Sequence, residues 1–567
     1  MFTINGYIFK SDGVTPEINP LVDITNINTG EEWIATVEED SNFYSLELIA
    51  GTDVNVGDTL RITSKKELED GPYDPENYTY SLNVTNREVT ETDVNNGGIF
   101  DFDLTLNHYC INYYPDYPYH IQEGWNYSGA AVMQMWTDFK LGFPHPQDIL
   151  QTWGQENNTQ ADKDEGLPYI DPQGMAATLN GLVYPSHFTV GVMPGDEDGL
   201  NYALHCICWW QCLGPGALPT GGDYSSWMSV RGIHTDKRPQ DGQYGGLGEW
   251  GYDVYGFWIN DPDSSPTSLG ANSYKTASEW TSTYYTTITD PYNQNWDGKY
   301  ITVLEPPEYE AKVTIVPSKP RFTDAISPTM ATKLVKIQDI EKTVLVEAIK
   351  DEEALDVIKA AIDSVTEELL PFDPSFSAAF AKTIPGEPLY VEDNNKDYYI
   401  VPFNMPIQKV NSQQSIKPLM PKRDTKNNLA EHVVDETAKI KQVSNGSILT
   451  ENTTLIVVIL DAEDGHFKEA SWVDNPVKYL PVSKEEALKL VFAEMKNIGI
   501  PPQLYGDPNI KLVHRDTSLY YPDWKITFDG SQMMFFVDQN RLVDYTIGLR
   551  DIPKGHFKLF NNKKTVS

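Results

Sequence analysis

Basic residues are scarce in this sequence. Its 567 residues include 43 Lys and Arg against 82 Asp and Glu, which gives a formal net charge of −39. Nucleic acids and anionic lipid surfaces both need a basic face, so this charge argues against either as a partner. The charge suits a protein whose copies repel one another, or one that works in salt or with calcium.

Long apolar runs are also missing. The longest candidate, LIVVIL at 455–460, is far shorter than the roughly 20 residues of a membrane helix, and it predicts a buried strand. We therefore expect no membrane span. The first residues, MFTINGYIFKSDG, lack the basic start and apolar run of a signal peptide. Either the protein is cytoplasmic or a leader precedes this sequence, and the domain types below favour an extracellular or cell-surface location.

Cysteines are few, and no cofactor motif is present. Cys206, Cys208 and Cys212 lie together in HCICWWQC, and Cys110 lies apart. The C-x-C-x3-C spacing is not that of a zinc site, so buried apolar thiols are the simpler interpretation. A disulfide between Cys110 and one of the three clustered cysteines remains an alternative interpretation. Phosphate-binding, dinucleotide and calcium-loop spacings do not occur in the right context, so we expect no cofactor and no metal site.

What the sequence does have is length, aromatic residues and turn formers. With 32 Tyr, 21 Phe, 38 Pro and 39 Gly, it favours sheet-rich, turn-rich structure. A chain of this length exceeds one hydrophobic core. We predict a multidomain protein: a β-sandwich, then an α+β domain, then an α+β region of helices and antiparallel sheet.

Residues 1–107 predict the β-sandwich. Stretches such as LVDITNINTGEEWIATV and FYSLELIAG alternate apolar and polar residues between Gly, Asn and Pro turns, and NTG at 28–30 indicates a hairpin. The order of these turns and strands over about the first 65 residues resembles the carboxypeptidase-regulatory-like domain. That resemblance implies a spacer or adhesion module of an exported protein, and the stretch itself offers no chemistry.

The C-terminal part changes character after a Pro-punctuated stretch at 304–324, which we interpret as a linker. Residues 325–567 predict helices at 351–370 and 483–497, the second with a capping box that begins at Ser483. The strands between them include YYIVPF and VVILDAEDGHFKEASW, and the helix-plus-strand pattern recurs loosely. These features resemble the PepSY fold, an exported helix-plus-sheet module. An unrelated α+β domain of similar pattern stays open.

Residues 108–303 carry the motifs that point to chemistry. HIQEGWNYSGAAVMQMW, at 120–136, has a glutamine, then a turn of small residues, then a helix with an apolar face. WMSVRG at 227–232 predicts a strand, and YGFWINDP at 255–262 predicts another that ends in Asn-Asp-Pro.

In this order, the segment from Gln122 to near Tyr285 resembles the papain-like cysteine peptidases of the bacteriocin-leader-processing type. That family shows a glutamine, then Cys-Gly-Pro-Ala on a helix, then His-Trp before a strand, then a strand that runs into Asp-Pro. The resemblance implies one role for each of four positions. They are the oxyanion glutamine, the nucleophile, the base and the orienting acid, at Gln122, Ser128, Ser226 and Asp261.

The departures from the family lie where the chemistry should be. Serine replaces both the nucleophilic cysteine, at Ser128, and the histidine, at Ser226. A serine hydroxyl is a poor nucleophile without a base within hydrogen-bond reach, and a helix N-terminus cannot ionise it near pH 7. We therefore expect a pseudopeptidase. As an exported surface or envelope protein, it would bind a peptide or protein in its cleft or serve as structure.

Two alternatives stay open. If His234 or His120 reaches Ser128, the chain is an active hydrolase, or an engineered Cys-to-Ser form of a cysteine peptidase. The other alternative is a subunit of a self-assembling surface layer or fibre, which predicts self-association despite the charge.

Overall fold

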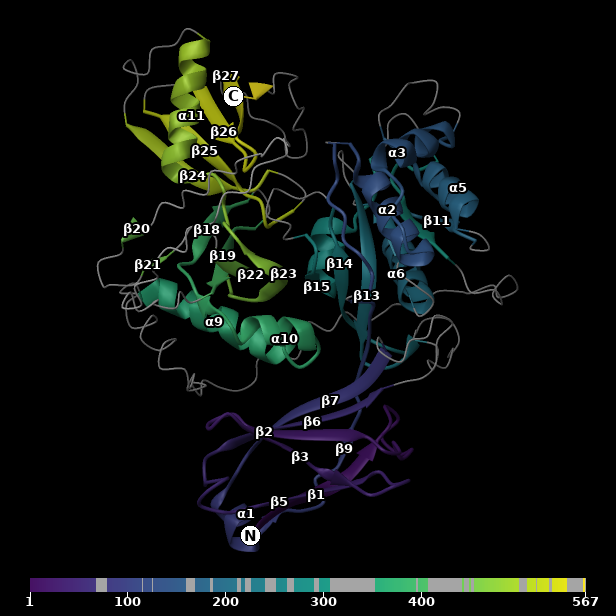
Figure 1. Ribbon diagram of the computed structural model, residues 1–567, viewed down its shortest axis with the longest axis vertical. Helices are drawn as coiled ribbons and strands as arrows, with labels where there is room; N and C mark the ends of the chain where they lie inside the picture. Colours follow the sequence, from purple (N-terminus) through teal and green to yellow (C-terminus); the bar gives the residue numbers. More distant parts are fainter. Residues whose placement is uncertain are drawn as a thin grey trace, which may run out of the picture.

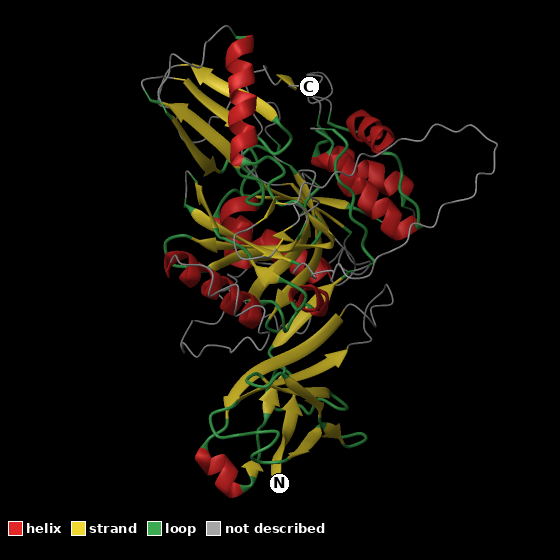
Figure 2. Ribbon diagram, turned by 60° about the vertical axis from the view of Figure 1, so that its left-hand side comes forward, coloured by secondary structure: helices red, strands yellow, loops and turns green. Residues whose placement is uncertain are grey.

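The computed structural model shows a multidomain protein, rich in sheet and with several helices (Figures 1 and 2). Short gaps aside, it describes residues 1–67, 79–305, 352–405, 453–498 and 507–547, and three short strands at 441–442, 448–449 and 564–565. From residue 306 onward, the predicted linker lies outside the described residues. Within the described part of the chain, no helix has the length and apolarity needed to cross a bilayer.

The N-terminal region forms two sheets around a core of its own. One sheet has the order β4-β5-β1-β8, with β9 also on β1, and the other runs β3-β2-β6-β7. Their inward-facing residues, such as Phe2, Val22 and Ile62, are fully buried together. The elements are β1 Phe2–Phe9, β2 Leu21–Asn26, β3 Glu31–Ile34, β4 Thr36–Val37, β5 Phe43–Leu48, β6 Thr59–Glu67, β7 Thr79–Glu88, α1 Glu91–Asn96, β8 Gly98–Ile99 and β9 Leu104–Thr105.

The central region packs helices against an antiparallel sheet in which β10, β13, β14 and β15 are neighbours. The apolar face predicted for the helix at Ser128 is buried, with Val132, Met135 and Trp136 fully inaccessible. The elements are β10 His108–Asn112, α2 Ser128–Leu141, α3 Gln147–Glu156, α5 Pro172–Leu182, β11 Thr189–Met193, α6 Glu197–Gln211, β12 Gly216–Pro219, β13 Trp227–Thr235, β14 Val254–Asn260, β15 Ser273–Thr276, α7 Ala277–Glu279, the π-helix η3 Trp280–Tyr284 and β16 Tyr300–Leu304.

The C-terminal region contains two successive arrangements of a helix followed by antiparallel strands (Figure 1). Ser483 caps the second helix as predicted, because its hydroxyl accepts the N–H of Glu486 at 3.2 Å. The first arrangement has α9 Glu352–Glu368, α10 Pro374–Phe380, β17 Ile384–Pro385, β18 Leu389–Glu392, β19 Tyr398–Asn404, β22 Thr454–Asp461 and β23 Phe467–Val477. The second has α11 Lys484–Asn497, β24 Pro508–Val513, β25 Asp523–Phe528, β26 Met533–Val537 and β27 Leu542–Ile547. The remaining short strands are β20 Lys441–Gln442, β21 Ile448–Leu449 and β28 Lys564–Thr565.

Backbone pairing crosses from each region to the next. The long strand β7 rises out of the N-terminal region and pairs with β10 (Figure 1). The edge strand β15 of the central sheet pairs with β23, and within the C-terminal region β18 of the first arrangement pairs in parallel with β24 of the second. The three regions are therefore joined through one continuous run of hydrogen-bonded strands, rather than by contacts between side chains alone.

Candidate functional site

The structure brings the four predicted site positions together in two contacts. Ser128 is the first residue of α2, and its Oγ accepts the backbone N–H of Trp227 at 3.1 Å. Trp227 directly follows Ser226 at the start of β13. The backbone N–H of Gln122 donates to the carbonyl of Pro262 at 3.0 Å, and Pro262 directly follows Asp261. Ser128 thus lies beside Ser226, and Gln122 beside Asp261.

The register of β13 and β14 relates these two contacts to each other. The two strands are antiparallel, and their first residue pair is Ser229 opposite Asn260. Asp261 therefore lies beyond this pair, toward the end of β13 that holds Ser226. The backbone of Asp261 is fixed by two hydrogen bonds. Its N–H donates to Gly270 at 2.9 Å, and its carbonyl accepts the Tyr119 hydroxyl at 2.9 Å. Asp261 is 1% exposed and Ser226 is 8% exposed, so this is a largely enclosed site.

Gly129 explains how the N-terminus of α2 approaches β13 so closely. A Cβ at this position would lie 3.1 Å from the Trp227 ring and 3.3 Å from Ile170. The Trp227 indole N–H donates to the Ile170 carbonyl at 2.9 Å, which holds the ring against the helix. Packing therefore favours a residue without a side chain directly after Ser128 in the sequence motif.

Gln147 positions the segment that carries Gln122, and sequence reasoning missed it. Its side-chain Nε2 donates to the Ile121 carbonyl at 2.8 Å and to Oε1 of Gln134 at 2.9 Å, and its Oε1 accepts the N–H of Glu123 at 2.9 Å. Gln147 is 1% exposed. No sequence signal marks it, because a glutamine in the first turn of a helix is ordinary.

His234, the first histidine considered as a base for Ser128, is engaged elsewhere. It lies at the end of β13 opposite to Ser226. Its Nε2 lies 3.0 Å from Nδ1 of His108, and its Nδ1 lies 3.0 Å from the Tyr274 hydroxyl. Burial lowers the pKa of His108 to about 4 and holds the pKa of His234 well below its usual range. The pair is therefore neutral at pH 7.

His120, the second histidine considered, pairs with a carboxylate on α2. Its Nε2 lies 2.9 Å from Oδ2 of Asp138. Asp138 lies roughly 15 Å along the helix axis from Ser128. Within the described residues, no imidazole is hydrogen-bonded to Ser128, whose Oγ instead accepts the Trp227 N–H. Among the described side chains, the hydroxyl therefore has no imidazole base to remove its proton.

Metal and thiol chemistry receive no support from the described side chains. Across the described ranges, no group of three or more His, Cys, Asp or Glu is placed to hold a metal ion. Cys110, Cys206 and Cys208 are buried thiols, which matches the simpler interpretation of the cluster and not the disulfide from Cys110. Cys212 lies outside the described residues.

A second buried polar cluster lies where β15 meets β23. Lys275 Nζ contacts Glu469 Oε2, and both side chains are fully inaccessible to solvent. Glu469 also accepts the Tyr284 hydroxyl at 3.0 Å, and Lys275 Nζ lies 3.7 Å from the centroid of the Tyr284 ring. Burial raises the pKa of Glu469, and the attraction of Lys275 opposes that shift.

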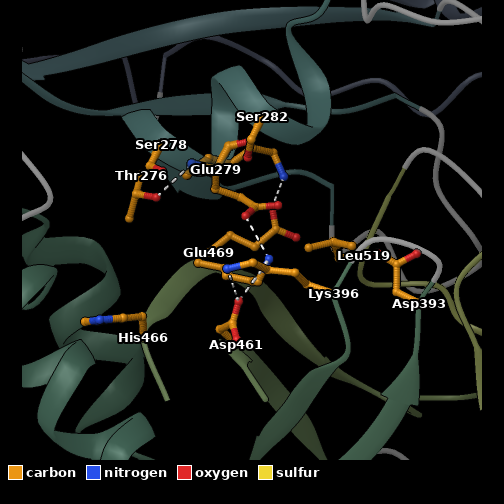
Figure 3. A network of polar contacts seen from close by, with 12 residues as sticks. Thr276, Ser278, Glu279, Ser282, Asp393, Lys396, Asp461, His466, Glu469 and Leu519 are labelled. Atoms are coloured by element: carbon orange, nitrogen blue, oxygen red, sulfur yellow. Dashed lines mark hydrogen bonds and ion pairs between the residues drawn. The ribbon is translucent and has the colours of Figure 1, made fainter. Parts of the chain in front are cut away.

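Further ion pairs extend this cluster toward solvent. Figure 3 shows Glu469 with Glu279 and Asp461 around it. Lys468 Nζ lies 3.1 Å from Glu279 Oε2 and 3.9 Å from Asp461 Oδ2, and Lys396 Nζ lies 3.5 Å from Asp461 Oδ2. The charges alternate in sign, so the network holds the central and C-terminal regions together.

Comparison with protein-family models found no match, and neither did comparison with curated proteins or with solved structures. Function must therefore be inferred from the residues of the chain itself.

Proposed function

We propose that this chain is a non-catalytic pseudopeptidase of papain-like type, in which the Ser128–Ser226 site binds a peptide or protein or serves as structure. The observation that carries the proposal is the hydrogen bond from the Trp227 N–H to Ser128 Oγ. In an active site of this type, an imidazole would contact the nucleophile. Replacement of both the nucleophile and the base leaves mainly binding.

The arrangement of elements supports the papain-like type. The N-terminus of α2 faces the start of β13, and the segment around Gln122 lies against the end of β14. A β-sandwich of carboxypeptidase-regulatory-like type before this domain, and a PepSY-like region after it, favour an exported surface or envelope protein. Two sheets around one core, and two helix-plus-sheet arrangements, support these assignments.

The first experiment is a hydrolysis assay on the full chain with fluorogenic peptide and ester substrates. We expect the rate to equal that of a Ser128→Ala variant, because no described imidazole contacts Ser128. A rate that disappears in Ser128→Ala would instead show an active serine hydrolase and would refute the proposal.

The second experiment rebuilds the site. We expect the thiol of a Ser128→Cys, Ser226→His double variant to react with iodoacetamide at lower pH than that of Ser128→Cys alone. A neighbouring imidazolium stabilises the thiolate, whereas the single variant has only the helix N-terminus. If the two alkylation profiles coincide, position 226 does not face position 128, and the papain-like assignment is wrong.

A further inference from the structure

Arg231 occupies a β-bulge in the middle of the central sheet. Val230 pairs with Ile259 on β14 and Gly232 pairs with Trp258, so Arg231 is the extra residue between them. Bulges redirect side chains, and they are common beside functional sites. Arg231 is 1% exposed, which is rare for a charged side chain.

The guanidinium group of Arg231 uses only part of its donor capacity. Its Nη1 donates to Oδ1 of Asn272 at 2.9 Å, and its Cζ lies 5.1 Å from the centroid of the Tyr114 ring. Its Nε and Nη2 are buried and have no hydrogen-bond partner among the described residues. Burial lowers the pKa of Arg231 to about 10, so the group stays charged at neutral pH.

The two unused nitrogens form the edge of arginine that binds oxyanions. The N–H groups of Nε and Nη2 point in parallel, at the spacing of two oxygens of a carboxylate or phosphate group. A water molecule could meet one or two of these donors but would bring no compensating charge. The unused edge therefore selects for an acceptor with two oxygens.

Trp472, which packs against the same Tyr114 ring as Arg231, has a further unused donor. Its Nε1 is buried and has no hydrogen-bond partner within the described part of the chain, and its ring packs edge-on against Tyr114, with centroids 5.1 Å apart. Its backbone N–H donates to the carbonyl of Asn272 at 3.3 Å. Arg231, on β13, and Trp472, on β23, thus both contact Tyr114 and Asn272.

The nearby carboxylates do not occupy this edge. Asp373 caps α10, and its oxygens accept the N–H of Phe376 at 2.9 Å and the indole N–H of Trp258 at 3.1 Å. It attracts Arg231 through space, but no described carboxylate forms an ion pair with Arg231. Asp474 is exposed and accepts the Tyr114 hydroxyl at 3.2 Å, which marks where the cluster meets solvent.

We propose that Arg231 on β13 and Trp472 on β23 bind a small oxyanion, a carboxylate or phosphate group, beside their shared neighbours Tyr114 and Asn272. Arg231 holds two oxygens through its Nε and Nη2 edge, and the Trp472 indole donates to one of them. The bound group would contact both the central and the C-terminal regions. This site is separate from Ser128, and the inference does not depend on the proposed function.

The test compares the thermal unfolding midpoint of the full chain in sodium acetate, sodium phosphate and sodium chloride at equal ionic strength. We expect a saturable rise in acetate or phosphate that chloride does not give. Arg231→Lys keeps the positive charge but loses the two parallel N–H donors of the guanidinium group, and it should weaken the apparent affinity for the anion at least tenfold. Trp472→Phe keeps an aromatic ring but loses the indole N–H, so it should weaken the affinity less. It also provides a second test of the site if Arg231→Lys does not fold.

The matched control is Arg541→Lys, which changes an arginine whose side chain is 52% exposed and pairs with Glu486. It should leave the response unchanged. The proposal is overturned if the wild type shows no saturable rise, or if Arg231→Lys and Trp472→Phe both respond as the wild type does. A crystal structure grown in acetate and phosphate with only water on the Arg231 edge would overturn it as well.

Discussion

Two buried polar clusters lie on the same central sheet, and they differ in charge and in sequence separation. The Ser128 cluster is centred on a neutral hydrogen bond between residues of two recognisable sequence motifs. The Lys275–Glu469 cluster is ionic, and its two partners lie 194 residues apart in the chain. A lost neutral hydrogen bond costs about 1 kcal/mol, whereas an uncompensated buried charge costs several times more. The cluster that the sequence reveals least should therefore matter most to stability.

The largest effect should come from Lys275→Met. It leaves Glu469 fully buried without its counter-charge, and we expect the free energy of unfolding to fall by about 3–5 kcal/mol. Urea unfolding, followed by tryptophan fluorescence, measures this loss. The control is Lys275→Met with Glu469→Gln, which keeps an acceptor for Tyr284 and should recover much of it. Equal losses in the single and double variants would mean that the charge is not the cause.

A smaller loss should follow Gln147→Ala. The substitution removes the amide that joins Ile121, Glu123 and Gln134, and we expect it to cost about 2–4 kcal/mol in the same unfolding experiment. Gln173→Ala, at an exposed position on α5, is the control and should change little. If both variants unfold like the wild type, Gln147 does not hold the Gln122 segment in place.

A paired glycine experiment separates packing from helix propensity. Gly129→Ala would bring a Cβ to 3.1 Å from Trp227, and we expect a loss of about 1–3 kcal/mol. Gly181→Ala in α5 meets nothing within 4 Å and should stabilise the protein by about 0.5–1 kcal/mol, because alanine favours the helix. If Gly129→Ala also stabilises the protein, Trp227 and Ile170 can move aside, and packing does not restrict this position to glycine.

The smallest expected effect concerns the pH dependence of stability. Burial raises the pKa of Glu368, at the end of α9, to about 8 from its ordinary 4.5. The folded protein therefore keeps a proton that the unfolded chain releases, so stability falls as pH rises from about 4.5 toward 8. Glu368→Gln should flatten that fall when urea unfolding is repeated across this range. Asp356→Asn, on the same helix with its side chain 79% exposed, should leave the profile as it is.

Local sequence signals predicted several elements, two of which belong to the Ser128 site. The apolar periodicity after Ser128 gave α2, WMSVRG gave β13, and the capping box gave the start of α11. The resemblance to papain-like peptidases predicted that Ser128 and Ser226 lie together, and Ser128 Oγ does accept the N–H of Trp227, the residue after Ser226. The roles that the resemblance implies for these positions stay predictions.

Other features could not be read from the sequence, for physical reasons. The pairing of β15 with β23 depends on strands far apart in the chain, and nothing local in either strand specifies the partner. The bulge at Arg231 arises from register, so WMSVRG indicates a strand but not which residue is displaced. His234 could be considered as a base only because sequence does not show that it lies at the wrong end of β13.

The pairing of β15 with β23 also has a consequence for synthesis of the protein on the ribosome. Ser273 pairs with Ser471, and at ordinary elongation rates the second emerges roughly 10 to 40 seconds after the first. During that interval, the central sheet presents β15 as an unpaired edge strand, which can pair with another nascent copy. Crowding of translating ribosomes should therefore lower the yield of native protein, and a chaperone that covers the edge should restore it.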